Sequence, residues 1–314
     1  MRILITGSNG LLGQKLVAAL RNDPEVELTA TSRGADRSPE PLGDRYRSMD
    51  ITVRSEVDAV FGGVKPEVVV HTAAMTNVDA CELDPAACQA QNVTATKHLV
   101  DAAKRCGSHF IHLSTDFIFD GEAGPYREED EPAPLSVYGR SKLDSERLVM
   151  EAGLEKWAIV RTIIVYGVAP GLSRSNVVLW AKGALEKGEP IRVVDDQWRM
   201  PTLAEDLADG CIRIAKRHAT GIFHLSGPDG MSILELVRRV GTFFGLDTSV
   251  VTAIKSDSLG QPAKRPPRTG FVLDKARRVL GYAPRSFEEG LAVVSGQLDQ
   301  RIPRPASNLR SPSP

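Results

Sequence analysis

Short runs of nearly continuous apolar residues alternate with amphipathic stretches along most of this 314-residue chain. The apolar runs predict strands that are buried on both faces, as in parallel sheets, and the amphipathic stretches predict helices that cover those faces. In the first half we expect strands over Arg2–Thr6, Leu28–Ser32, Tyr46–Asp50, Val68–Thr72, Phe110–Ser114 and Ala158–Arg161, and helices over Leu11–Leu20, Arg54–Phe61, Pro85–Arg105 and Val137–Glu151.

The alternation becomes less regular after Gly167. There we expect helices over Ser175–Glu186, Ala204–Lys216, Ile233–Phe243, Asp274–Leu280 and Phe287–Leu298, and strands over Ile191–Val194 and Ile222–Ser226. The pattern predicts an α/β fold with a doubly wound parallel sheet over residues 1–167. Residues 168–300 are expected to form mainly a smaller lobe, with some segments crossing back to the sheet. Residues 301–314, rich in Pro, Ser and Arg, are predicted to be a disordered tail.

Composition narrows the function classes. The chain is 42% apolar and 25% charged with a net charge of −1, so it has no general attraction to nucleic acid or anionic lipid. No stretch approaches the 18 apolar residues of a membrane span, and Met1 leads directly into the first strand without a signal peptide. The four cysteines lack the spacing of a zinc site, so we expect reduced thiols and no metal. We predict a cytoplasmic protein that binds neither nucleic acid nor membrane.

The first strand leads into a turn with three regularly spaced glycines, Gly7, Gly10 and Gly13. Glycines in this pattern permit a tight turn, let the backbone approach a pyrophosphate, and let the next helix pack closely on the strand. The free N–H groups at the start of that helix attract phosphate. Because the pattern joins the first strand to the first helix of a parallel alternation, it predicts a Rossmann-type dinucleotide site.

The end of the second strand indicates which dinucleotide binds. Sites that prefer NAD(H) usually place an acidic residue about 20 residues after the glycines, to bind the ribose hydroxyls. Here Ser32 and Arg33 stand at that place, and an arginine can bind a 2′-phosphate through two hydrogen bonds. We therefore favour NADP(H) over NAD(H), with a solvated arginine as the alternative. Asp50 is either a partner for the adenine amino group or an exposed carboxylate.

Two further strands end in small or polar residues, at the edge where open α/β sheets bind ligands. Residues 72–74 (Thr-Ala-Ala) are small enough for a cofactor to pass close to the backbone, and His71 before them is expected to be structural. Ser114 and Thr115 end the fifth strand. A hydroxyl at that place can hydrogen-bond a substrate carbonyl and polarise it for hydride attack.

Tyr138 and Lys142 lie four residues apart in a predicted helix, so they point to the same side. A tyrosine normally keeps its proton up to about pH 10, and a nearby ammonium is expected to lower the pKa of Tyr138 and make it a proton donor near neutrality. None of the other four tyrosines has a lysine at this spacing. The pair predicts an enzyme that moves a hydride and a proton, with a solvated helix face as the alternative.

Three motifs occur in order along the chain: Gly7-x-x-Gly10-x-x-Gly13, Ser114-Thr115-Asp116-x-x-Phe119-Asp120-Gly121 and Tyr138-Gly-x-Ser-Lys142. Together they resemble the extended short-chain dehydrogenase/reductases, and within them the dTDP-4-dehydrorhamnose reductases of dTDP-rhamnose biosynthesis. The resemblance spans roughly residues 1 to 300. It implies an NADPH-dependent reduction of the 4-keto group of a nucleotide-linked deoxysugar. In that reaction Tyr138 would donate the proton, Lys142 would anchor the nicotinamide ribose, and Thr115 would orient the carbonyl.

These arguments predict three sets of site residues. The catalytic residues are Thr115, Tyr138 and Lys142. The cofactor-binding residues are Gly7, Ser8, Asn9, Gly10, Leu11, Leu12, Gly13, Ser32, Arg33, Asp50, Ile51, Thr72, Ala73, Ala74, Asn92, Ser114, Tyr138 and Lys142. The substrate-binding residues are Thr76, Val78, Thr115, Asp116, Phe117, Tyr138, Ile164 and Arg199.

Three positions depart from the pattern of the family that the chain resembles. Phe117 stands where the family more often has tyrosine, Ile164 where it usually has tryptophan, and Arg199 where it usually has glycine. Losing an aromatic wall changes the stacking on the sugar, and an added arginine can contact a carboxylate or a phosphate. The type of reaction is unaffected, but the identity of the sugar does not follow.

Two other functions stay open at this point. One is an NAD(P)-dependent epimerase or dehydratase of nucleotide sugars, which keeps its cofactor bound and recycles it. The other is a non-catalytic, dinucleotide-binding regulatory subunit that resembles the methionine adenosyltransferase β subunit. In each case we expect a nucleotide sugar or a protein as the partner, and a homodimer is compatible with the sequence.

Overall fold

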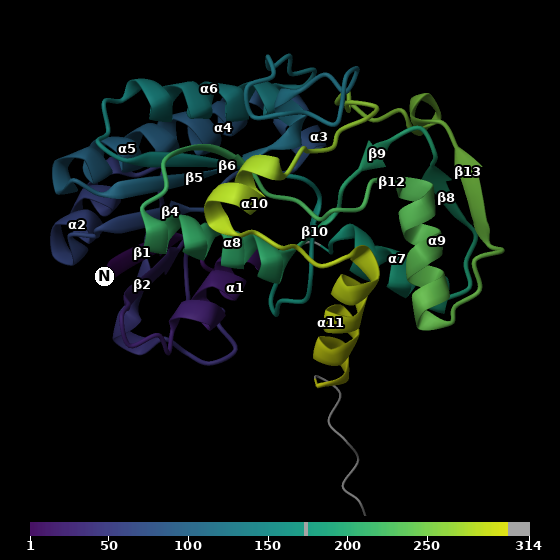
Figure 1. Cartoon of the computed structure of the whole chain (residues 1–314), viewed down its shortest axis with the longest axis horizontal. Helices are drawn as coiled ribbons and strands as arrows, with labels where there is room; N and C mark the ends of the chain where they lie inside the picture. The colour runs from purple at the N-terminus through teal and green to yellow at the C-terminus, as the bar shows by residue number, and fades with distance from the viewer. Residues whose placement is uncertain (173–174, 301–314) are drawn as a thin grey trace, which may run out of the picture.

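The computed structural model describes residues 1–172 and 175–300, so the predicted tail at 301–314 lies outside the described residues. Its largest unit is a seven-stranded parallel sheet with the order β11-β6-β5-β4-β1-β2-β3 (Figure 1). The strands are β1 (Arg2–Thr6), β2 (Glu27–Ser32), β3 (Tyr46–Ser48), β4 (Val68–His71), β5 (His109–Thr115), β6 (Trp157–Thr162) and β11 (Gly221–His224).

Helices cover both faces of this sheet (Figure 1). Successive residues of a strand point to opposite faces, so Ile3 packs with Leu16 of one helical layer and Leu4 packs with Leu99 of the other. This confirms the predicted doubly wound fold. One layer holds α2 (Arg54–Val64), α5 (Ala95–Cys106) and α6 (Val137–Glu151), and the other holds α1 (Leu11–Leu20), α8 (Ala204–Arg217) and α10 (Asp274–Leu280). None of the helices in the described ranges is both long and apolar enough to cross a bilayer.

A second lobe lies beside the carboxyl ends of the strands (Figure 1). Its core joins Val178, Val237 and Leu291 from three helices with Val193 and Val251 from a parallel pair of strands. The elements are α7 (Val177–Glu186), β8 (Ile191–Val194), α9 (Ile233–Phe244), β13 (Val251–Ile254) and α11 (Phe287–Asp299). Between its segments the chain returns to the sheet, where β11 pairs with β6 and α8 packs on α1.

The structure adds elements that the periodicity did not predict. The predicted helix over Pro85–Arg105 is α4 (Pro85–Gln89), a π-helical turn over Ala90–Thr94, and α5. Several unpredicted elements are too short to show a periodic pattern; the strands among them form by pairing with distant segments, and the one helix among them is capped by a side chain. They are α3 (Val78–Leu83), β7 (Val165–Tyr166), β9 (Trp198–Arg199), β10 (Thr202–Leu203) and β12 (Met231–Ser232); β13, of four residues, was not predicted either.

Candidate active site

A cavity of about 680 Å³ opens at the carboxyl ends of the central strands. Residues that follow β1, β2, β3 and β4 line one end of it, and the ends of β5 and β6 with the start of α6 line the other. This is the edge at which open α/β sheets bind ligands. Most of the predicted site residues meet here, although they come from segments that are far apart in the sequence.

The glycine turn forms the floor at one end of the cavity. Gly7 has a φ of 72°, and its carbonyl accepts a hydrogen bond from Gly10 N at 2.9 Å. A Cβ on Gly13 would lie 2.2 Å from the Gly7 carbonyl oxygen, so only glycine lets α1 start this close to β1. No side chain caps the N-terminus of α1, so its first N–H groups remain available to phosphate. These features fit a dinucleotide.

Ser32, Arg33, Asp50 and Ile51 line the same end of the cavity, as predicted for the adenosine half of a dinucleotide. The Arg33 side chain is 75% exposed, and its guanidinium lies 3.7 Å from the Asp50 carboxylate. A guanidinium with this much exposure can turn toward a phosphate at low cost. The carboxylate is held by Thr52, whose hydroxyl and backbone N–H both donate to Asp50 Oδ1.

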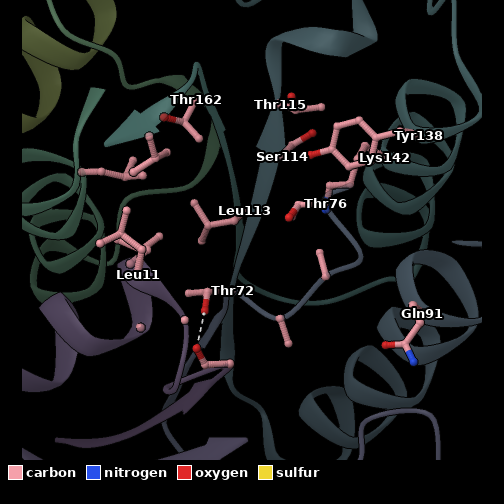
Figure 2. Close-up of a pocket in the computed structure, with 18 of the residues that line it drawn as sticks. Leu11, Thr72, Thr76, Gln91, Leu113, Ser114, Thr115, Tyr138, Lys142 and Thr162 are labelled. Atoms are coloured by element: carbon pink, nitrogen blue, oxygen red, sulfur yellow. Dashed lines mark hydrogen bonds between the residues drawn. The ribbon is translucent and has the colours of Figure 1, made fainter. Parts of the chain in front are cut away.

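The catalytic candidates meet at the other end of the cavity. Thr115 ends β5, and Tyr138 and Lys142 lie in the first two turns of α6. Figure 2 shows the Tyr138 ring directed toward Ser114 and Thr115, with Lys142 on the same side of the helix. A Cβ on Gly139 would lie 2.2 Å from the Phe117 carbonyl oxygen, so glycine at this place lets the start of α6 approach the turn that follows β5.

The pKa of Tyr138 differs from the prediction. Burial raises it above the ordinary value of 10, while the hydrogen bond with the Thr115 hydroxyl acts in the opposite direction and the Asp116 charge raises it further. The predicted lowering of this pKa is therefore wrong: burial outweighs the other effects, and Lys142 is not among the groups that shift it. The phenol keeps its proton throughout the neutral range, which is the form that a proton donor requires.

The ammonium of Lys142 contacts a buried histidine. Its Nζ lies 3.3 Å from His112 Nε2, which is also 2.9 Å from Ser145 Oγ. Burial lowers the pKa of His112 well below 6.5, so the ring is neutral, and Nε2 accepts from the ammonium in the tautomer that carries the ring proton on Nδ1. Burial also lowers the pKa of Lys142 to about 8, against the opposing charge of Glu146. This contact could not be predicted from the sequence, because no local pattern relates His112 to α6.

Seven of the eight predicted substrate residues line the cavity, and Arg199 does not. Its guanidinium is 1% exposed and faces the Asp116 carboxylate, at 3.8 Å from Nε to Oδ2. The predicted contact with a carboxylate thus exists, but the carboxylate belongs to the protein. Ile164 lines the cavity with a φ of 27°, which is rare for a β-branched residue and indicates local strain.

Three of the predicted cofactor residues also lie outside the described lining: Ser8, Asn9 and Asn92. Asn9 holds the loop after β2, because its side chain donates to Ala35 O and accepts from Arg37 N. Asn92 accepts from Met75 N and donates to Ser141 Oγ, and so ties a cavity-side loop to α6. Asn9 and Asn92 therefore hold segments that form the cavity wall without lining it themselves.

Several lining residues were not predicted. Thr162 pairs in register with Thr115 across β6 and β5, so the rule that ligands bind at strand ends could have found it. The others reach the cavity through tertiary packing that no local pattern reveals. The unpredicted lining residues are Thr31, Met49, Gln91, Leu113, Thr162, Val165, Ser175, Asn176, Val177 and Leu207.

Comparisons with known proteins agree with this geometry. The model of the protein family described as RmlD substrate binding domain matches residues 1–299. A dTDP-4-dehydrorhamnose reductase of Streptomyces griseus is 32% identical over 317 residues, which cover 97% of both chains. The methionine adenosyltransferase 2 subunit beta of Pongo abelii is 32% identical over 290 residues, which cover 91% of this chain and 84% of that one.

A solved structure gives the same picture. The dTDP-4-dehydrorhamnose reductase of Bacillus anthracis, in complex with NADP, superposes with a TM-score of 0.81 at 27% identity. The match covers 94% of this chain and 99% of that chain. The sheet and the second lobe therefore have counterparts in a reductase structure that holds a dinucleotide.

Proposed function

This chain belongs to the family of RmlD substrate binding domains, and we propose that it is an NADPH-dependent reductase. Its proposed reaction reduces the 4-keto group of a nucleotide-linked deoxysugar, with dTDP-4-dehydrorhamnose as the leading substrate. One observation carries the proposal: Thr115, Tyr138 and Lys142 come together in the cavity that the glycine turn opens. The relatives named dTDP-4-dehydrorhamnose reductase support it.

Each of the three residues has a distinct role in the proposed reaction. Tyr138 donates its proton to the C4 oxygen, and burial keeps that proton on the phenol in the neutral range. Thr115 orients the carbonyl next to the phenol. Lys142 anchors the nicotinamide ribose through its ammonium, which His112 holds in place. NADPH, when bound, supplies the hydride that C4 receives.

The proposed cofactor site is residues 7–13, which cradle the pyrophosphate, with Arg33 for the 2′-phosphate. The unprotected start of α1, the close approach at Gly13 and the exposed guanidinium support this assignment. The Ser114 hydroxyl is buried at the cavity wall and has no hydrogen-bond partner among the described residues, so a bound cofactor could satisfy it. NAD(H) is the alternative cofactor.

The proposed division of labour follows the two lobes. Residues 1–167 would bind the cofactor and carry the catalytic residues, and residues 168–300 would mainly bind the substrate. Ser175, Asn176 and Val177, at the start of α7, line the cavity from residues 168–300, which supports this division. The homodimer and the cytoplasmic location remain predictions from the sequence.

The direct test follows NADPH oxidation with a panel of nucleotide-linked 4-keto sugars. Turnover of at least one of them is expected, and Tyr138→Phe should lower kcat by about 10²-fold or more while NADPH affinity stays intact. Tyr282→Phe is the matched control, because Tyr282 is also buried but does not line the described cavity. Full activity of the Tyr138→Phe enzyme would remove the proton-donor role.

A regulatory subunit is the second candidate, because a methionine adenosyltransferase 2 subunit beta is as similar in sequence as the reductase. The complete set of Thr115, Tyr138 and Lys142 in the cavity supports the reductase instead. Pull-down of a methionine adenosyltransferase, together with no turnover of any keto-sugar, would favour the subunit. An epimerase or dehydratase would copurify with NAD and consume no NADPH.

A further inference from the structure

Arg199 is among the largest fully buried side chains of the described structure, with 1% of it exposed. Its Nη1 donates to the Trp198 carbonyl at 2.7 Å and lies 3.4 Å from the Pro267 carbonyl. The guanidinium carbon lies 5.7 Å from the centre of the Phe117 ring. Phe117 lines the cavity, so its ring stands next to both the guanidinium and the cavity. A buried guanidinium is costly unless a charge compensates it.

The compensating charge is Asp116, which is 2% exposed and directly follows Thr115. Its two carboxylate oxygens have different partners. Oδ2 accepts from the Thr269 hydroxyl at 2.5 Å and lies 3.8 Å from Arg199 Nε. Oδ1 accepts from the Thr115 hydroxyl at 3.1 Å. The carboxylate therefore links β9 and the 265–269 loop to the hydroxyl that ends β5.

We propose that Arg199 is a positioning residue that holds the Asp116 carboxylate so that Oδ1 fixes the direction of the Thr115 hydroxyl beside Tyr138. The proposal rests on the reductase function, in which Thr115 orients the substrate carbonyl. A hydroxyl has one proton to donate, and Thr115 donates it to Asp116, while its oxygen has Phe117 N at 3.3 Å and the Tyr138 hydroxyl as its other partners. A substrate carbonyl must compete with Oδ1 for this proton.

Arg199 sets the strength of that competition. By drawing negative charge toward Oδ2, the guanidinium and the Thr269 hydroxyl weaken Oδ1 as an acceptor, so the Thr115 proton can be shared with a carbonyl. Without the guanidinium, the buried carboxylate either binds the Thr115 proton more strongly or takes up a proton itself. Both outcomes misdirect the hydroxyl, and misplacing a catalytic group costs up to about 10²-fold in rate.

Because Asp116 is titratable, the proposed role of Arg199 should make the activity depend on pH in a specific way. Burial raises the pKa of Asp116, and Arg199, Thr269 and Thr115 act in the opposite direction, Arg199 foremost. Removing the guanidinium should therefore raise the pKa of this carboxyl further. Among the described residues, Tyr138 also faces Asp116 and Arg265 also faces Arg199, and Arg265 is itself hydrogen-bonded to Asp79.

The test compares Arg199→Met with the wild-type enzyme across pH. In Arg199→Met the acid limb of kcat/KM should move about 1 to 3 pH units upward, and kcat should fall about 10-fold or more, with KM for NADPH unchanged. Arg199→Lys keeps a positive charge, so its acid limb should lie between those of Arg199→Met and the wild type. Arg285→Met is the matched control: it removes the arginine partner of buried Asp206, which is not in the described lining, and should leave the limb in place.

Infrared spectroscopy detects the protonation of the Asp116 carboxyl without any substrate. The band of a protonated carboxyl should appear at higher pH in Arg199→Met than in the wild type, and be missing in the double variant with Asp116→Asn. A wild type that reduces no keto-sugar would contradict the proposed function, while this band would still report on Arg199.

If Arg199→Met does not fold, Asp116→Asn must abolish the acid limb. An Arg199→Met enzyme with wild-type kcat and acid limb overturns the proposal, whatever its stability.

Discussion

Replacing Lys142 by methionine should make this protein more stable and far less active. The lysine is 3% exposed, and burial lowers the pKa of its ammonium from 10.5 to about 8. Methionine has a similar length and no charge, so it can occupy the same space without the cost of desolvating an ion. Activity should fall because the proposed anchor of the nicotinamide ribose is lost.

The size of the stability gain follows from the pKa. The pKa of Lys142 falls from 10.5 to about 8 on folding. At pH 7, where the lysine is protonated in both states, this shift lowers the free energy of unfolding by about 3 kcal/mol. Losing the contact with His112 costs about 1 to 2 kcal/mol in the other direction. We therefore expect a net gain of about 1 to 2 kcal/mol at neutral pH.

The sign of the pH dependence follows from proton binding. Between about pH 8 and pH 10.5 the unfolded wild type holds the Lys142 proton and the folded one has lost it. Wild-type stability should rise through this window, because the unfolded state binds more protons. The advantage of Lys142→Met should therefore shrink as the pH rises through the same window.

Urea unfolding at about pH 7 and about pH 10 measures both effects. Lys97→Met serves as the matched control, since Lys97 is 59% exposed in α5 and its loss should change stability by at most about 0.5 kcal/mol. NADPH oxidation measured on the same samples gives the activity. A Lys142→Met variant that is less stable than the wild type at pH 7 would refute the argument from burial.

Three further variants test other parts of the structure. Arg33→Asp should move the ratio of kcat/KM for NADPH over NADH about 10-fold or more toward NADH, and an unchanged ratio removes the role in 2′-phosphate binding. Gly139→Ala should lower kcat about 10²-fold, because a Cβ would lie 2.2 Å from the Phe117 carbonyl and must displace α6; wild-type kcat would contradict this. Glu146→Gln should lower the free energy of unfolding in urea by about 3 to 5 kcal/mol, because it leaves the guanidinium of Arg161 buried without its ion pair. A loss below about 1 kcal/mol would argue against a stabilising role of that pair.

The sheet could be predicted from the sequence because its strands are buried on both faces. A run such as Ile3–Ile5 is apolar at every position, and such runs separated by amphipathic helices define a parallel sheet. The strands β9 and β12 could not be predicted in this way. They have two residues each, and they exist because Met231 and Arg199 pair across a long stretch of chain. Periodicity over two residues carries no information.

The residues of the candidate site also differ in whether the sequence could predict them. Residues next to strand ends, such as Thr115 and Asp50, could be placed because the ends of parallel strands meet at one edge. Residues whose role depends on a distant partner could not. Arg199 was expected to face the substrate and instead faces Asp116, and His112 was not singled out although it contacts Lys142. An electrostatic partner is a property of the folded chain, not of spacing.

The buried charges around this cavity are explained by function better than by stability. Lys142, Asp116 and Arg199 are each at most 3% exposed, and burial shifts the pKa of each toward its neutral form. A fold selected for stability alone would replace them with apolar side chains, as buried ion pairs often can be. Lys142 and Asp116 line the cavity, and Arg199 reaches it only through its ion pair with Asp116, so all three are linked to the proposed reaction site. If apolar replacements raised stability and left turnover intact, this reading of the site would be wrong.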